Sequence, residues 1–297
     1  MGRLSAGTPE EMDLLVDKLV AYDNYSADDT WRNRGMILCD DQYSSSITGS
    51  GSYCYQGASE RGFEQAADSL VVRFNRDACY TDFSVDVMKV GTYYDAAPGL
   101  GRNVTGRDRP GAPRDCPSVG PHIAYSKAVV SPAWVQLASQ GHLFQIYGGH
   151  ANRLVMGTEH FVEFNGAFSS PDSRTIDQLT NYGKPFIFVG AACHLNEFEH
   201  FQEADSKHSL AEAMVLLSGR GAIASIASSG YEWVYTNMPT EIFLGDALFA
   251  DHPLDPDTGL PRSVLGEGMD EGLLRLAASW PGGKDVPSGY RDTIKSY

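Results

Sequence analysis

The chain has 297 residues, of which 42% are hydrophobic and 21% are charged, a composition typical of a globular protein of one large or two smaller domains. Its formal net charge is −15, which argues against nucleic acids or anionic membranes as partners. The longest apolar runs are only as long as strands, so the sequence predicts no membrane-spanning helix. The five cysteines show no spacing typical of structural zinc.

The first half of the chain predicts helices and strands separated by two long loops. Thr8, Pro9 and Glu11 form a helix start, with Thr8 as the N-cap and Pro9 at the first helical position. Asp40 and Asp41 follow directly after an apolar strand. The expected segments are helices at about 9–22 and 61–70, strands at 35–39 and 82–92, a loop at 42–60 and an exposed excursion at 95–121.

In the second half the alternation of helix and strand continues. Ser209 and Glu212 form a capping box that begins another helix. The expected segments are a short helix at 134–140, strands at 142–150, 185–193 and 221–227, a loop with one helical turn at 151–183, and helices near 210–217, 239–250 and 269–279. This alternation predicts an α/β fold with a mostly parallel sheet covered by helices on both faces.

Two of these strands end in reactive side chains. The first runs from His142 through Gly148 and Gly149 to His150, and the second runs from Pro185 to Cys193. Both are short apolar runs of the kind that form buried parallel strands, and ligands of open α/β sheets bind at the carboxyl ends of such strands. If the two strands are neighbours, an imidazole and a thiol lie side by side above the sheet.

An imidazole beside a thiol is the minimal set of groups for a cysteine peptidase. A thiol attacks as the thiolate and needs a nearby base, and acyl transfer also needs backbone N–H groups for the oxyanion. Taken singly, His150 is better explained as a polar residue leaving a strand and Cys193 as a small core residue. Their placement at consecutive strand ends favours the catalytic interpretation.

The order of several motifs resembles the gingipain family of cysteine peptidases, which are caspase-like enzymes. The resemblance covers nearly all of the chain, and the block from Cys193 to Gly221 is its most specific part. The segments that carry it are Gly2-Arg3-Leu4, Val16-Asp17-Lys18, Ala21-Tyr22, Trp31-Arg32, Leu38-Cys39-Asp40-Asp41, Tyr147-Gly148-Gly149-His150, Ala192-Cys193, Ser209-Leu210-Ala211-Glu212-Ala213 and Gly221-Ala222-Ile223-Ala224.

The resemblance assigns roles to residues of this chain by position. It implies His150 as general acid/base, Cys193 as nucleophile, and the N–H groups of Cys193 and Ala151 as oxyanion donors. The family usually has Gly where Ala151 stands, so the turn at this position can differ. Trp233 matches an aromatic that packs against the substrate's P1 side chain, with an ordinary core or surface Trp as the alternative. Asp95 is a positional candidate for a pocket carboxylate, with an ordinary turn residue as the alternative.

The same resemblance suggests how the chain is organised. Family members usually have more sheet before the Gly-Arg-Leu segment and a further segment after the last residues seen here. We therefore expect residues 1–28 to be the terminal helix of a preceding, truncated subdomain and residues 29–297 to be the caspase-like catalytic domain. Further domains of a longer precursor and a secreted or cell-surface location are also implied.

The sequence offers candidates for a metal site and for disulfides but does not decide between the alternatives. The chemistry requires no cofactor, but the resemblance implies a structural calcium ion, for which the loop at 255–259 is a weak candidate. The histidines and glutamates between 194 and 208 lack an HExxH spacing and are better explained as a solvated loop. Cys54, Cys79 and Cys116 lie in loop-like surroundings where a disulfide is plausible, whereas Cys39 lies within a strand.

The function predicted from the sequence is hydrolysis of peptide bonds through a Cys193–His150 dyad and a thioester acyl-enzyme, with protein or peptide substrates. One alternative keeps the dyad but transfers the acyl group to another amine, as a sortase-like transpeptidase at the cell surface does. The other is a catalytically inactive surface or scaffold module, for which the Ala at position 151 is the only hint.

Overall fold

The computed structural model describes residues 4–24, 30–41, 44–48, 51–55, 61–76, 83–96, 123–164, 174–198, 208–250, 265–279, 295 and 297. Their centre is a five-stranded parallel sheet in the order β4-β1-β5-β8-β9. Its strands are β1 (Arg34–Cys39), β4 (Ser84–Lys89), β5 (Phe144–Gly148), β8 (Phe186–Ala191) and β9 (Ala222–Ala227).

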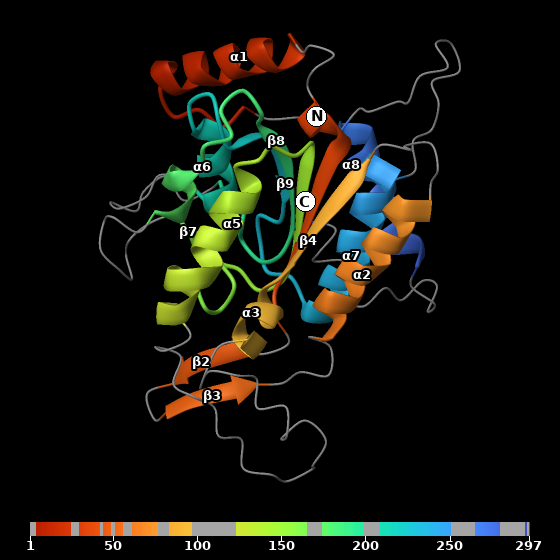
Figure 1. Cartoon of the computed structure of the whole chain (residues 1–297). Coiled ribbons are helices and arrows are strands. Elements are labelled where there is room, and N and C mark those ends of the chain that lie inside the picture. The colour runs from red at the N-terminus through yellow and green to blue at the C-terminus, as the bar shows by residue number, and fades with distance from the viewer. Residues whose placement is uncertain are drawn as a thin grey trace.

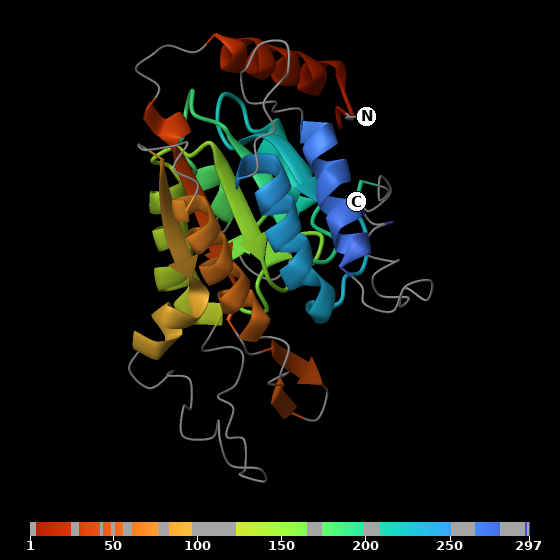
Figure 2. The same ribbon diagram turned by 90° about the vertical axis from the view of Figure 1, so that its right-hand side faces the viewer.

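Helices cover both faces of the sheet, which Figure 1 shows nearly edge-on. The α2–α7–α8 layer consists of α2 (Arg61–Arg76), α7 (Val234–Gly245) and α8 (Leu265–Ala278). The α5–α6 layer consists of α5 (Ser131–Ala138) and α6 (Leu210–Leu216). Figure 2 shows α2, α7 and α8 side by side in front of the strands. The predicted α/β architecture with both faces covered is confirmed.

The apolar runs of the sequence fill two cores, one on each face of the sheet. In β1, Met36 and Leu38 pack toward the α5–α6 layer, whereas Ile37 and Cys39 pack toward the α2–α7–α8 layer. All four side chains are buried because successive side chains of a strand point to opposite faces and both faces are covered. This explains why the strand is a continuous apolar run rather than an alternating one.

The carboxyl ends of the strands lie at the edge of the sheet where α3 (Val90–Ala96) and the hairpin β2 (Ser44–Thr48) and β3 (Gly51–Tyr55) are found. Helix α1 (Pro9–Asp23) lies at the opposite edge (Figure 1) and contacts α6 and β9. The predicted N-cap is confirmed, since Thr8 Oγ1 accepts the Glu11 N–H at 3.2 Å. The buried Lys18 donates to the carbonyl oxygens of Val215, Arg220 and Ala222.

Several boundaries differ from the sequence-based expectations. Helix α2 ends at Arg76 rather than near residue 70, and α8 begins at Leu265 rather than near residue 269. Residues 44–55, expected as loop, form the antiparallel hairpin β2–β3, because backbone pairing does not require the β-branched side chains that usually indicate a strand. Residues 90–92, expected in a strand, begin α3. Helix α7 begins at Val234 rather than at Pro239, which the helix accommodates in its interior although proline usually starts a helix.

The segment 151–183, expected as a loop with one helical turn, contains short regular elements. Strands β6 (Val155–Met156) and β7 (Val162–Glu163) form a small antiparallel hairpin, and Thr175–Gln178 forms a 3-10 turn. Two residues per strand are too few for a sequence pattern to show. The excursion after residue 96 and the loop at 255–259 lie outside the described residues, and the division at residue 28 stays a prediction. None of the described helices is long and apolar enough to cross a membrane.

Candidate active site

The sheet brings His150 and Cys193 to the same edge. Strands β5 and β8 are hydrogen-bonded neighbours, parallel, with Gly148 opposite Ala191. His150 and Cys193 each follow two residues after this pair, so they leave adjacent strands at the same level. The His150 ring lies on the side of the α2–α7–α8 layer, where it contacts Phe63 of α2.

The main chain of His150 is fixed by three hydrogen bonds. Its N–H donates to Asp40 Oδ2 at 3.0 Å. Its carbonyl oxygen accepts the Tyr147 hydroxyl at 2.5 Å and the Gly157 N–H at 2.8 Å. Because Asp40 follows β1 and Gly157 belongs to the β6–β7 hairpin, two neighbouring elements of the site determine where the histidine lies.

The two glycines before His150 leave room for other side chains. A Cβ at Gly149 would overlap the Tyr147 hydroxyl and Asp40 Cβ, which are the groups that hold the histidine main chain. A Cβ at Gly148 would overlap the carboxyl group of Glu241 from α7. The Gly-Gly pair is therefore required for close approach on both faces of β5.

The imidazole ring lies in partly apolar surroundings. It packs edge-on against Phe63 of α2, with 5.5 Å between the ring centroids. Asp40 is buried, and this burial raises its pKa to about 7, although the nearby His150 charge and backbone N–H groups oppose the shift. Asp40 Oδ1 also accepts the Asp41 N–H at 2.9 Å, so one carboxyl group organises two residues of the site.

The thiol of Cys193 is held by the main chain of Glu232, in the loop between β9 and α7. The Glu232 N–H donates to Sγ at 3.2 Å, and the thiol lies 3.3 Å from the Glu232 carbonyl oxygen, where it can donate. Burial raises the pKa of the Cys193 thiol, and the bond from the Glu232 N–H partly offsets this effect. The resting state is therefore the neutral thiol, and reaction requires a base.

The residue after the cysteine adopts an unusual conformation. His194 has a φ of 55°, in the left-handed region that only a small share of residues other than glycine adopt. Its N–H donates to Gly230 O at 2.9 Å, its Nδ1 lies 3.1 Å from Glu197 Oε2, and its ring contacts Tyr231. The turn after Cys193 is thus joined to the same loop that holds the thiol.

Trp233, Asp95 and Ala151 are the other residues that the sequence predicts for the site. Trp233 directly follows Glu232 and is 52% exposed, stacked on Tyr235. Asp95 lies in α3, but its side chain is outside the described residues. Ala151 pairs with Met156 in an antiparallel bridge whose hydrogen bonds are made by the flanking residues. The Ala151 N–H therefore points away from Met156.

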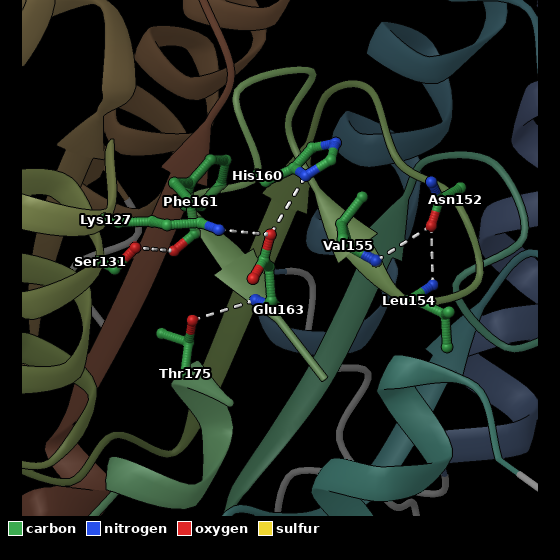
Figure 3. Close-up of polar contacts among 9 residues, drawn as sticks. All are labelled: Lys127, Ser131, Asn152, Leu154, Val155, His160, Phe161, Glu163 and Thr175. Carbon is green, nitrogen blue, oxygen red and sulfur yellow. Dashed lines mark hydrogen bonds and ion pairs between the residues drawn. The ribbon is translucent and has the colours of Figure 1, made fainter. Parts of the chain in front are cut away.

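The β6–β7 hairpin next to His150 carries a polar cluster, shown in Figure 3. The buried Glu163 lies 3.1 Å from His160 Nδ1 and 3.5 Å from Lys127 Nζ, and its own N–H donates to Thr175 Oγ1. Asn152 Oδ1 accepts the backbone N–H groups that follow it, Leu154 at 2.8 Å and Val155 at 3.1 Å, and Ser131 Oγ donates to Phe161 O at 2.6 Å. These bonds stabilise the segment to which the His150 carbonyl is tied.

Among the described residues, three buried carboxylates lie close enough to bind one cation. They are Asp40, Asp41 and Glu159, with ligand oxygens within 4.8 Å of one another. Carboxylate oxygens are the ligands that Ca²⁺ prefers, so the donor set fits that ion. The histidines and glutamates after Cys193 do not gather in the described part of the chain: His194 pairs with Glu197, whereas His208 pairs with Glu11.

Sequence reasoning missed three groups of the site. They are the buried acids Glu232 and Glu241 and the partly buried Tyr297, none of which belongs to a motif. Asp40 was noted only as an acid after a strand, although its position at the carboxyl end of a buried strand indicates the active-site edge. Cys39 and Cys193 are free thiols, and the side chains of the other cysteines lie outside the described residues.

Comparisons with known proteins identify the family and the fold of this chain. The model of peptidase family C25 matches residues 1–294. The chain belongs to peptidase family C25. This confirms the resemblance to gingipains drawn from the sequence motifs. A search of curated protein sequences finds no significant match.

Solved structures share the fold of this C25 chain. The crystal structure of the Arg-specific cysteine proteinase gingipain R (RgpB) has a TM-score of 0.64 and 15% identity, with 100% of this chain and 52% of that chain covered. The complex of Porphyromonas gingivalis RgpB pro- and mature domains has a TM-score of 0.59 and 16% identity, with 99% and 52% covered. The chain thus spans about half the length of these proteins and has their caspase-like fold.

Proposed function

We propose that this C25 chain is the catalytic portion of a cysteine endopeptidase. The observation that carries the proposal is the register of β5 and β8, from which His150 and Cys193 leave neighbouring strands at one level. Membership of a peptidase family supports the same conclusion independently.

In the proposed mechanism, His150 accepts the proton of the Cys193 thiol, and the thiolate attacks the carbonyl carbon of the scissile peptide bond. His150 then returns that proton to the leaving amine, and the C–N bond breaks to leave a thioester. Water, deprotonated by His150, attacks the thioester, releases the carboxylate product and restores the thiol.

The oxyanion that forms in each addition step requires N–H donors that are already in position. The proposed donors are the backbone N–H groups of Cys193 and Ala151. The direction of the Ala151 N–H, away from Met156, supports its role. Because the donor is a backbone group, Ala in place of Gly at position 151 does not remove it.

Substrate contact is proposed for Trp233, which is half exposed and adjacent to the residue that holds the thiol. A preference for Arg at P1, the specificity of gingipain R, is the first to test. It requires a carboxylate in the pocket, for which Asp95 stays a candidate. A secreted or cell-surface location and further domains of a longer precursor are proposed with this function.

The decisive experiment is labelling with peptidyl electrophiles that differ in P1 residue, Arg and Lys included. We expect labelling of the wild type and none of Cys193→Ala or His150→Ala. Cys39→Ala is the matched control, because Cys39 is a buried free thiol whose loss leaves labelling unchanged. No labelling of the folded protein by any probe, with calcium present, would overturn the proposal. Peptide products joined to an added amine would show the transpeptidase reaction instead.

A structural calcium ion at Asp40, Asp41 and Glu159 is a second proposal. Three converging carboxylates repel one another, so a bound cation stabilises the fold. We expect the thermal midpoint to rise with calcium in the wild type and to rise less in Glu159→Gln. Glu267→Gln, on the distant helix α8, is the control variant. Its thermal midpoint should rise with calcium as much as that of the wild type. No calcium-dependent rise in the wild type would exclude this site.

A further inference from the structure

One buried acid next to the thiol is not used by the proposed chemistry. Glu232 is only 8% exposed, and its main chain holds the Cys193 sulfur through the two contacts of 3.2 and 3.3 Å described above. The sulfur therefore lies against the Glu232 main chain. Besides burial, a negative charge on the Glu232 side chain raises the pKa of the Cys193 thiol.

The loop that carries Glu232 is fastened to the segment after Cys193. His194 N–H donates to Gly230 O, and Asn196 N–H donates to Ser228 O, both at 2.9 Å. Within the loop, Ser228 Oγ accepts the Gly230 N–H at 3.1 Å. These bonds come just before Glu232 on the loop and just after Cys193 on the other segment. They therefore hold the loop against the segment that contains the cysteine.

The Glu232 carboxyl group is buried, and neither of its oxygens has a hydrogen-bond partner among the described residues. The nearby hydroxyls of Tyr297 and Ser228 favour the ionised form, but the Tyr297 hydroxyl donates to Gly190 O of β8 at 2.9 Å. A buried carboxyl group without partners is more stable neutral than ionised.

The charged and titratable groups around Glu232 do not favour its ionisation. Cys193 lies on the β8 side, Tyr297 near the end of the chain, and Glu241 on α7, and each becomes negative when it loses a proton. On the segment after Cys193, His194 Nδ1 lies 3.1 Å from Glu197 Oε2, so this histidine faces Glu197. Burial raises the pKa of Glu232 to about 8, so the acid is neutral in neutral solution.

We propose that Glu232 is a positioning residue whose buried carboxyl group, while neutral, lets Cys193 react and, once ionised, suppresses the thiolate. A negative carboxylate beside the sulfur disfavours a second negative charge there. The inference rests on the proposed function for its catalytic consequence, but not for its effect on the thiol. It predicts that the reactivity of Cys193 is limited on the alkaline side by Glu232.

The test is the rate of alkylation of Cys193 by iodoacetamide from pH 5 to 10, followed by mass spectrometry of the Cys193 peptide. In Glu232→Gln, which keeps the main-chain contacts and removes the charge, we expect the midpoint of reactivity to fall by about one pH unit. Glu197→Gln is the matched control, since Glu197 pairs with His194 and not with the sulfur. A folded Glu232→Gln protein with the wild-type midpoint would overturn the proposal.

Two further readouts complete the experiment. The wild-type alkylation curve should rise in two steps, since two coupled acids titrate together, and a single-step curve would contradict the proposal even if Glu232→Gln failed to fold. The pH profile of kcat/KM should extend to more alkaline pH in Glu232→Gln. A shifted alkylation midpoint in a protein that cleaves no peptide would uphold Glu232 and refute the peptidase proposal.

Discussion

The ends of β5 and β8 hold their reactive residues in opposite ways. At the β5 end, the main chain of His150 is bonded and its ring packs on Phe63. At the β8 end, the side chain of Cys193 is itself bonded, to a loop 39 residues further along the chain. The histidine is therefore fixed by close steric packing, and the cysteine by a long-range connection. We therefore expect the position of His150 to be sensitive to added side-chain volume, and the Cys193 thiol to be sensitive to added charge.

The largest effect is expected at the β5 end from Gly149→Ala. The new methyl group overlaps the Tyr147 hydroxyl and Asp40, so the His150 main chain must move. A misplacement of this kind costs about 100-fold in kcat/KM, and overpacking costs about 2 kcal/mol in the free energy of unfolding. Gly266→Ala on α8 has open space around the new methyl and should keep full activity. Equal activity of the two variants would contradict the steric interpretation.

A smaller effect is expected from Asp40→Asn. The amide keeps one acceptor oxygen, but its NH2 group must face either the His150 or the Asp41 N–H. Loss of one hydrogen bond to a charged group lowers the free energy of unfolding by about 2 kcal/mol. Chemical denaturation measures this change, and kcat/KM reports whether His150 shifts. Unchanged stability would mean that Asp40 does not organise the β5 end.

Between the two strand ends, Glu241 predicts a pH dependence of stability. It is fully buried, neither of its oxygens has a hydrogen-bond partner among the described residues, and burial raises its pKa well above 4.5. The folded state therefore binds the proton more tightly than the unfolded state. This contribution is present below pH 4.5 and is lost as pH rises toward the folded pKa, by up to about 1.4 kcal/mol per pH unit.

Glu241→Gln should remove this slope. We expect the variant to gain stability relative to the wild type as pH rises from 5 to 7, measured by urea denaturation at each pH. A constant difference between the two proteins over this range would show that Glu241 ionises as readily in the folded state as in the unfolded state.

The smallest effect is expected far from both strand ends, at Thr8→Ala. Loss of the N-cap bond to the Glu11 N–H lowers the free energy of unfolding by about 1 kcal/mol. Activity should not change, because α1 lies at the opposite edge of the sheet (Figure 1). A loss of kcat/KM in the folded variant would show that α1 influences the site after all.

The sequence predicted the parts of the molecule whose determinants are local. The strands around Met36, Ile146 and Val189 were predicted because their burial on both faces requires continuous apolar runs. The N-cap at Thr8 and the capping box at Ser209 have residues in fixed positions, and both were confirmed. The positions of His150 and Cys193 at the carboxyl ends of two strands were predicted because each residue follows such an apolar run.

What the sequence did not predict depends on tertiary contacts. Glu232 comes to the thiol only because β9 lies next to β8, and Tyr297 reaches Gly190 from the far end of the chain. No motif marks a buried acid whose partners are main-chain atoms or distant hydroxyls. The hairpin at 44–55 was missed because its serines and glycines are typical of loops.

The hydrogen bonds between Cys193 and Glu232 also have a consequence for the folding of the nascent chain. The sulfur is held by a residue that can reach it only after β9 has added to the edge of the sheet. Parallel pairings across long stretches of chain form slowly, and an N-terminal part of the chain leaves the ribosome first. A nascent chain that contains His150 and Cys193 but not yet Glu232 therefore lacks the contact that holds the sulfur. In the proposed function, both members of the dyad are then present before the thiol is held in place.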